Sequence, residues 1–551
     1  PADGTAVGVS GTDNSTLTIV NLDGLTISST FESTSEVVGI KGIESQMGGT
    51  VKITTQSDIL TDLEGNSNVV GLSVGDGDSS SMFLVSESGS IVTEINRNGD
   101  TSSDAHGARI SNGSTLELNA GKNIVFDVNS TTENDYQNAV TGVSVVKGSF
   151  KAEAGGYVSI SANGPFADAD ALSIVALDGL PSKADILAKG KDDDGFGIRI
   201  TAQGGDSLSL TSIDRISAVS SFGNLKLKTT SGAILLQADS LVQGCALCNT
   251  SGSFDIISAS DVILSATSKS DQTYGIFSTM STSDSRIVGD KIKISSRSEA
   301  TYAYGVTTQF SAGTTSVFGN TLKIKASSVE NSLGYGIYAP GGNISTTTTD
   351  STEIEASGTG ILVEDISGFA GKADIRSYKT ISVQSDSTNI YAKNGGEISL
   401  WANQNITLNT KATSVFSTKA NSQVQISSCS GKNSVTGKTG VYATDEGTIS
   451  LRAAQGNEVT ATGTYGLYAL KASSISLLST EHDNTVATGT VDDEDYGTGM
   501  AVVSSARSSV TVQANGQNLI KGAVWLIGAE RANESTTSVT LTAFNNEIYS
   551  H

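Results

Sequence analysis

The chain has 551 residues, with 60 glycines, only 4 prolines and a formal net charge of −23 at pH 7. A surface this acidic does not suit nucleic acid or anionic lipid, because both are bound by clustered lysine and arginine. No run of about 18 apolar residues occurs, so the sequence predicts no membrane-spanning helix. The first residues, PADGTAVGVSG, are typical of turn and strand, and we expect a mature or trimmed segment.

A short phrase returns along the chain with small changes. It reads TYGIF at 273–277, AYGV at 303–306, GYGIYA at 334–339, KTGVYA at 438–443 and TYGLYA at 464–469. Each copy opens a unit of three short runs in which apolar and polar residues alternate. Turns rich in Gly, Asn, Asp and Ser separate the runs.

Equivalent anchor residues divide the whole chain into about 19 units, spaced 19 to 36 residues apart. The anchors are Gly8, Gly39, Gly71, Gly107, Gly142, Ala171, Gly197, Ile216, Gly244, Gly275, Gly305, Gly336, Gly360, Asn389, Ser414, Gly440, Gly466, Gly499 and Gly522. A repeat of this length indicates a solenoid, because one unit is too small to bury its own apolar side.

The alternation within each run has a period of two, which indicates strands. Stacking each run on its equivalent in the next unit makes the ladders parallel. The sequence therefore predicts an all-β fold, a single right-handed parallel β-helix over residues 1–551 with three short strands per coil. An array of antiparallel sandwiches is the main alternative, and it would show hairpin signals at 8–12-residue spacing.

The position two residues after the anchor glycine should point outward, because alternate residues of a strand face opposite sides. In the first part of the chain, about 1–243, we assign this position to Lys41, Ser73, Arg109, Ser144 and Arg199. That face is polar.

The same outward position becomes largely aromatic over about 244–551. It reads Phe277, Thr307, Tyr338, Leu362, Tyr391, Phe416, Tyr442 and Tyr468. Stacked aromatic rings stabilise neighbouring strands. Exposed aromatic patches also mark interaction sites. Both interpretations stay open, as does an inverted parity that would place the rings inside. The partner-binding hypothesis names Phe277, Tyr338, Tyr391, Phe416, Tyr442 and Tyr468.

Three cysteines are present, Cys245 and Cys248 in the string CALC, and Cys429. A zinc site would need four ligands, and neither a second CxxC nor a nearby histidine pair supplies them. The close pair therefore indicates either a local disulfide or two buried thiols.

Acidic residues gather just before several anchors. They are Asp104, Glu133, Asp135, Asp192–Asp194, Asp271 and Asp492–Asp495. They should line one edge of the solenoid, either as a solvated corner that prevents edge association or as a loose Ca²⁺ or docking strip. We expect no obligate metal and no cofactor.

Strings such as GVYATDEGTISLRA and YGLYALKASSISLLS resemble passenger domains of autotransporter (type V secreted) proteins of Gram-negative bacteria. The resemblance spans essentially the whole chain and is one of pattern. It implies a β-helical stalk at the bacterial surface or released from it, exported through an outer-membrane barrel that this segment does not contain. It also implies a role in adhesion, aggregation or biofilm formation.

We therefore expect a non-catalytic adhesin. Its partners would be a protein or glycan of a host cell, the extracellular matrix or a bacterial surface, including another copy of the chain, and not nucleic acid. The alternative is a carbohydrate-active enzyme, a polysaccharide lyase or hydrolase, on the same scaffold. Such an enzyme would need paired carboxylates in a groove.

Overall fold

The computed structural model describes residues 6–21, 23–31, 39–98, 104–131, 139–164, 168–177, 182–189, 196–203, 208–213, 223–241, 243–250, 252–281, 283–329, 333–489, 499–527 and 537–549. These residues form strands and turns, and none of them forms a helix. No segment among them could therefore cross a membrane as a helix. The chain divides into two compact units, residues 1–300 (unit 1) and 301–551 (unit 2).

Unit 1 contains β1 (Ala6–Gly11), β2 (Thr16–Asn21), β3 (Leu25–Phe31), β4 (Gly39–Gln46), β5 (Thr50–Thr55), β6 (Ile59–Gly65), β7 (Asn68–Asp76), β8 (Ser81–Ser86), β9 (Ile91–Arg97), β10 (Ala105–Ile110), β11 (Thr115–Ala120), β12 (Ile124–Ser130), β13 (Ala139–Val146), β14 (Ser149–Ala154), β15 (Val158–Asn163), β16 (Asp168–Leu177), β17 (Ser182–Ala188), β18 (Phe196–Gln203), β19 (Leu208–Ile213), β20 (Gly223–Thr229), β21 (Ala233–Ser240), β22 (Gly244–Thr250), β23 (Ser253–Ile257), β24 (Val262–Ser268), β25 (Thr273–Thr279), β26 (Ser285–Val288) and β27 (Lys291–Ser298).

Unit 2 contains β28 (Ala303–Gln309), β29 (Thr314–Ser328), β30 (Gly334–Pro340), β31 (Asn343–Ala356), β32 (Thr359–Glu364), β33 (Lys372–Ser377), β34 (Thr380–Ser385), β35 (Ile390–Lys393), β36 (Glu397–Ala402), β37 (Ile406–Thr410), β38 (Thr413–Thr418), β39 (Gln423–Ser428), β40 (Asn433–Thr444), β41 (Thr448–Ala453), β42 (Asn457–Ala469), β43 (Ser474–Ser479), β44 (Asn484–Thr488), β45 (Met500–Ser505), β46 (Ser509–Ala514), β47 (Gln517–Lys521), β48 (Ala523–Ile527), β49 (Ser538–Thr542) and β50 (Asn545–Tyr549).

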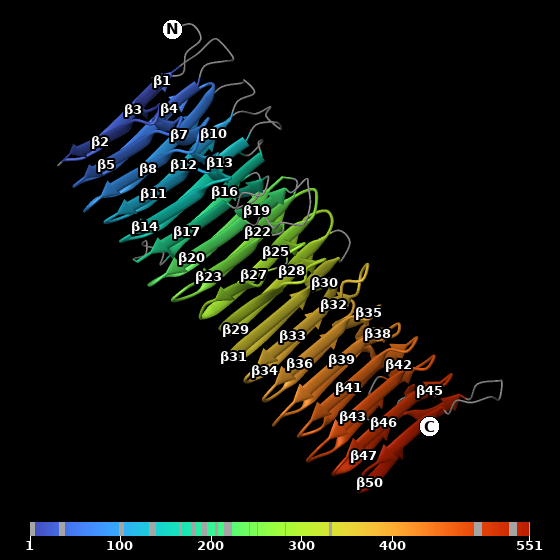
Figure 1. The fold of residues 1–551 in the computed structure, drawn as a ribbon. Helices are drawn as coiled ribbons and strands as arrows, with labels where there is room; N and C mark the ends of the chain where they lie inside the picture. The colour runs from blue at the N-terminus through green and yellow to red at the C-terminus, as the bar shows by residue number, and fades with distance from the viewer. Residues whose placement is uncertain are drawn as a thin grey trace. The chain divides into compact units, whose positions relative to one another are not determined.

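Each unit is a parallel β-solenoid with three strands to a turn. In unit 1 each of the strands β1 to β24 pairs in parallel with the strand three places later, as β1 does with β4 and β10 with β13 (Figure 1). In unit 2 four long strands run through a corner and serve two sheets, as β31 does when it pairs with both β33 and β34. The parallel ladders confirm the predicted fold class over the antiparallel sandwich.

The three sheets of each unit take their names from the order of strands within a turn. Sheet 1 of unit 1 contains β1, β4, β7, β10, β13, β16, β19, β22 and β25. Sheet 1 of unit 2 contains β28, β30, β32, β35, β38, the second half of β40, the second half of β42, β45 and β48. The next strands of each turn form sheet 2, and the last form sheet 3.

The turn count from sequence was too high. Sheet 1 has nine described strands in each unit, one for each turn, against the expected total of 19 units. One extra unit came from Gly197, which lies in β18 and so in sheet 3, beside β15 and β21. Ile216, another anchor, lies outside the described residues.

The core is a column of aliphatic side chains, one layer for each turn. In unit 2, Ile337, Ile354, Val383 and Leu408 are among many that are fully buried. Fully burying such a side chain contributes about 1.5–3 kcal/mol. Because each layer repeats the same burial, the strand periodicity seen in the sequence continues through the unit.

A row of buried asparagines closes the corner where sheet 3 of unit 2 begins. The amide of Asn433 donates to the side-chain oxygen of Asn457 at 2.8 Å, and the amide of Asn457 donates to that of Asn484 at 2.9 Å. Asn484 in turn donates to Asn518 at 3.1 Å. Each amide donates to the next asparagine, which satisfies most of the buried polar atoms at this corner. The side-chain oxygen of Asn433, the first of the four, has no hydrogen-bond partner among the described residues.

The corner after sheet 1 relies on residues with positive φ, and many of them are not glycine. Lys471 and Ala472, which follow β42, have φ of 56° and 62°. Glycine and asparagine, which adopt positive φ most readily, therefore supply this geometry in only some of the turns. Gly466, the anchor of the same unit, lies inside β42 rather than in the turn.

Candidate interaction surface

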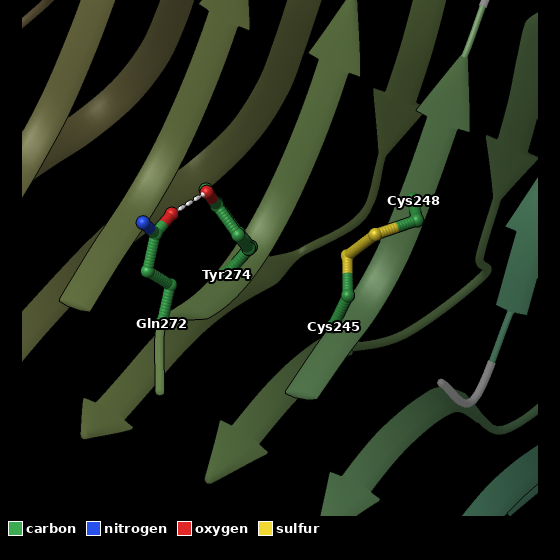
Figure 2. The surroundings of a disulfide bond; sticks show 4 residues. All are labelled: Cys245, Cys248, Gln272 and Tyr274. Atoms are coloured by element: carbon green, nitrogen blue, oxygen red, sulfur yellow. Dashed lines mark hydrogen bonds between the residues drawn. A yellow bond between two sulfur atoms is a disulfide. The ribbon is translucent and has the colours of Figure 1, made fainter. Parts of the chain in front are cut away.

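The strands of sheet 1 bend sharply at the position of the anchor glycines. In β22 this position is Ala246, which lies opposite Gly275, and not the predicted anchor Gly244. In β22, Cys245 and Cys248 form a disulfide with their Cα atoms 5.8 Å apart (Figure 2). Three residues of straight strand would span roughly 10 Å and would place these side chains on opposite faces. The bend at Ala246 and Leu247 therefore brings residues i and i+3 together on one side.

Other strands of sheet 1 use the same two positions for different chemistry. In unit 1, Cys245 is in register with Tyr274 and Cys248 with Phe277, and the two rings lie 4.8 Å apart. Figure 2 shows Tyr274 on the strand next to the disulfide, hydrogen-bonded to Gln272.

In unit 2 the paired positions are occupied by tyrosines. The rings of Tyr335 and Tyr338 lie 5.4 Å apart, and those of Tyr465 and Tyr468 lie 4.5 Å apart. The outward face of sheet 1 thus has two adjacent lines of side chains. Strict alternation from the sequence identified only the second of them.

Glycine at the anchor allows the bend to approach the rest of the turn closely. A Cβ on Gly336 would lie 2.3 Å from the Cγ2 atom of Ile354 and 2.6 Å from the carbonyl oxygen of Gly360. Elsewhere the position tolerates other small residues. Asn389 and Ser414, uncertain anchors in the sequence, are buried and hydrogen-bond to each other at 3.1 Å.

The residues predicted to form the outward row of unit 2 lie opposite one another in neighbouring strands of sheet 1. Thr307 pairs with Tyr338, Tyr338 with Leu362, and Leu362 with Tyr391. The row continues to Phe416, Tyr442, Tyr468, Val503 and Trp525. The last two residues were not anticipated, because their strands lack the tyrosine phrase.

Four of these rings stack into a continuous array, here called the aromatic column: Tyr391, Phe416, Tyr442 and Tyr468. Successive centroids are 4.7, 4.9 and 5.0 Å apart, with planes 22°, 8° and 9° apart. Each ring face is covered by its neighbour in the next turn. A molecule approaching from outside therefore meets the ring edges and the phenol hydroxyls.

The column lies outside the core. All four of its rings are half-buried, whereas Val415, Val441 and Leu467, one residue earlier in their strands, are fully buried. The inverted parity considered in the sequence is wrong for these rings. Burial raises the pKa of Tyr391 and of Tyr468 above the ordinary tyrosine value.

A second ring cluster lies at the start of unit 2, formed by Tyr302, Tyr304, Tyr335 and Tyr338. The Tyr304 ring stacks on those of Tyr335 and Tyr338 at 5.3 and 5.6 Å. The hydroxyl of Tyr338 donates to the buried carboxylate of Glu364 at 3.1 Å, and Lys393 pairs with that carboxylate at 3.0 Å. The hydrogen bond that Lys393 donates to the Glu364 carboxylate raises the pKa of Lys393, so this lysine stays charged.

The outward row is not uniformly exposed. Thr307 and Val503 are fully buried, and Leu362 separates the second cluster from the column. Trp525, which follows Val503, is 50% exposed. Trp525 is therefore the most exposed ring of this row in unit 2, and the column is its continuous run of stacked, partly exposed rings.

In unit 1 the assignment of the polar face needs two corrections. Ser73, Arg109 and Ser144 are in register as expected. The residue in register with Ser73 from β4 is Glu44, not Lys41. Lys41 occupies the other paired position, three residues earlier, and forms an ion pair with Glu44.

Arg199 is the second correction. It lies in β18 of sheet 3, in register with Ser159 and Leu235, and not in sheet 1. The error follows from the extra unit counted at Gly197.

The acidic positions are only partly described. Asp104 and Asp271 lie directly before β10 and β25, as expected. Glu133, Asp135, Asp192–Asp194 and Asp492–Asp495 lie outside the described residues. Within the described ranges, no three His, Cys, Asp or Glu side chains come close enough to hold a metal ion.

Comparison with known proteins gives no relative for this chain: no family model, no curated protein and no solved structure matches it.

Proposed function

We propose that the protein is a non-catalytic adhesin of the bacterial surface, or one released from it, that attaches cells to each other or to a matrix. Its solenoid would present a long surface, and the aromatic column would be the main contact face. The resemblance of its repeats to autotransporter passenger domains supports this localisation and role.

The observation that carries the proposal is the aromatic column itself. Its rings are partly exposed, in register and regularly spaced along sheet 1 of unit 2. Tyrosine combines a large apolar contact area with a polar tip and is enriched at interfaces. A rigid row of such side chains loses little conformational entropy when a partner binds.

The charge of the chain fits contact through aromatic rather than basic groups. With 57 acidic and 34 basic residues, the surface would repel anionic partners at long range. Contacts through ring edges and hydroxyls depend little on ionic strength. We therefore expect adhesion to persist, or to strengthen, when salt screens the negative charge.

The test replaces the three tyrosines of the column, Tyr391, Tyr442 and Tyr468, together with serine. Beads coated with the native chain or the variant are compared for attachment to bacterial cells, host cells and matrix proteins, after circular dichroism has shown that both chains are folded. The proposal expects attachment to fall at least tenfold in the variant. Equal attachment of two folded chains would reject the column as the contact face.

A further inference from the structure

A groove of about 370 Å³ lies in unit 2 at the corner between sheets 2 and 3. It is lined in part by the first residues of β42, the strand whose far end bears Tyr468 of the aromatic column. Its polar lining consists of Lys432, Gln455, Glu458, His482, Asp483 and Thr485. The volume is within the range of small-molecule sites in proteins, about 300–1,000 Å³.

The groove exists because three successive turns at this corner differ in length. The turn 454–456 has three residues, whereas the turns on either side, 429–432 and 480–483, have four. The shorter turn is therefore recessed between two longer ones. The outer turns are two strand spacings apart, roughly 10 Å.

The floor of the recess is held by Gly456. Its φ is +109°, and a Cβ there would lie 1.9 Å from the carbonyl oxygen of Asp483. No other residue allows the two turns to approach so closely, because both the space and the backbone conformation require glycine. The groove is thus built into the backbone rather than left by a side chain.

The polar groups of the lining are held in place by the solenoid. Lys432 pairs with Glu458 at 2.9 Å, and both side chains remain about half-exposed. One carboxylate oxygen of Asp483 accepts the backbone N–H of Gln517 at 2.7 Å. This contact fixes the carboxylate on the exposed turn that also presents the His482 side chain.

The lining favours a neutral ligand rich in hydroxyls. Lys432 contributes one positive charge, Glu458 and Asp483 contribute one negative charge each, so an anion gains nothing from entering. A sugar hydroxyl both donates and accepts, and it can bond an ammonium and a carboxylate that lie side by side. The recess between two turns has room for one six-membered ring.

We propose that this groove binds a neutral pyranose residue of a glycan. The site is separate from the aromatic column and does not depend on it. An adhesin with both would contact a surface at two places on the same solenoid, and bivalent contact raises the overall affinity above that of either site.

The experiment uses the full chain and saturation-transfer NMR with methyl glucoside, methyl galactoside, methyl mannoside and glucuronate. We expect transfer to the ring protons of at least one neutral glycoside. The Asp483→Asn and Gln455→Ala variants change exposed side chains, so folding is not at risk. Affinity should fall about tenfold or more in Asp483→Asn, because a charged hydrogen bond is lost.

Glu481→Gln is the matched control, because this exposed residue is on the same turn but outside the groove, and it should leave the affinity unchanged. Absence of transfer to all three neutral glycosides would overturn the proposal. It would also be overturned if Asp483→Asn and Gln455→Ala both bound the glycoside with the affinity of the native chain. Tighter binding of glucuronate would overturn the charge argument. The serine variant of the aromatic residues should keep glycoside binding, which separates this site from the proposed adhesion face.

Discussion

Tyr465 and Tyr468 are three residues apart in one strand, yet their rings stack with centroids 4.5 Å apart and planes 14° apart. A straight strand would point these side chains to opposite faces. The bend at Gly466 brings them together, and the bend in β22 does the same for Cys245 and Cys248. One backbone feature therefore supports a ring pair in one turn and a covalent bond in another.

The disulfide should stabilise unit 1 modestly. It closes a loop of only four residues, for which the loss of unfolded-state entropy amounts to about 2 kcal/mol. The double variant Cys245→Ala, Cys248→Ala should lower the free energy of unfolding by about that amount in guanidinium titration. Cys429→Ala is the control, because this cysteine is free and exposed. Identical unfolding of the native chain with and without reductant would contradict the prediction.

Adding a methyl group at the bend should destabilise unit 2. In Gly336→Ala the new Cβ would meet Ile354 and the backbone of Gly360, and neither can move without disturbing a ladder. We expect a loss of about 2 kcal/mol or more in the free energy of unfolding, as for other overpacked cores. Ala246→Gly is the comparison, because the methyl group of the native alanine already fits at this bend. Its removal should lower the free energy of unfolding by about 1 kcal/mol or less. Equal stability of native and Gly336→Ala chains would show that the anchor does not need glycine.

The stacked asparagines should contribute measurably to stability. In Asn457→Ala the amide of Asn433 and the side-chain oxygen of Asn484 both lose a buried partner. Each unsatisfied buried group costs about 1–3 kcal/mol, so we expect a loss of about 3 kcal/mol in denaturant unfolding. Asn409→Ala, at an exposed position of a neighbouring strand, should change stability by less than about 0.5 kcal/mol. Similar losses in the two variants would exclude a special role for the stack.

Alkaline pH should weaken the fold through Tyr274. Burial, assisted by the charge of Asp271, raises the pKa of this phenol to about 12. Unfolded tyrosine ionises near 10, so between about pH 10 and 12 only the folded chain keeps the proton. The contribution of Tyr274 to stability is full below about pH 10 and decreases as the pH rises to about 12.

Unfolding of the native chain and of Tyr274→Phe, measured from about pH 9 to 12, checks this. The native chain should lose more stability than the variant across that interval. Parallel pH profiles would mean that the phenol ionises in the folded chain at its ordinary value.

The fold could be predicted from the sequence because one pattern repeats in almost every turn, and each repeat buries the same aliphatic layer. The row from Tyr338 to Tyr468 could be predicted for the same reason. The companion line through Tyr335 and Tyr465 could not, because alternation assumes a straight strand and the bend breaks it. Lys41 was misassigned for another reason: the sequence predicts Gly39 as the anchor of its unit, whereas Gly42 is the residue aligned with Gly71, so the outward residue of β4 is Glu44.

The groove at Gly456 could not be predicted from the strand repeat either. It depends on a difference of one residue between neighbouring turns, and the alternation within the strands does not specify the length of a turn. A repeat alignment that compared the turns 429–432, 454–456 and 480–483 would have revealed the recess.

The most direct test of the adhesion face is the reactivity of its tyrosines in the free and the attached chain. Nitration by tetranitromethane followed by peptide mass spectrometry would measure Tyr442 and Tyr468 beside Tyr378, which is 59% exposed in the turn between β33 and β34. We predict that attachment to cells protects Tyr442 and Tyr468 at least several-fold and leaves Tyr378 unchanged. Equal nitration of Tyr442 and Tyr468 in the free and attached chains would contradict the account.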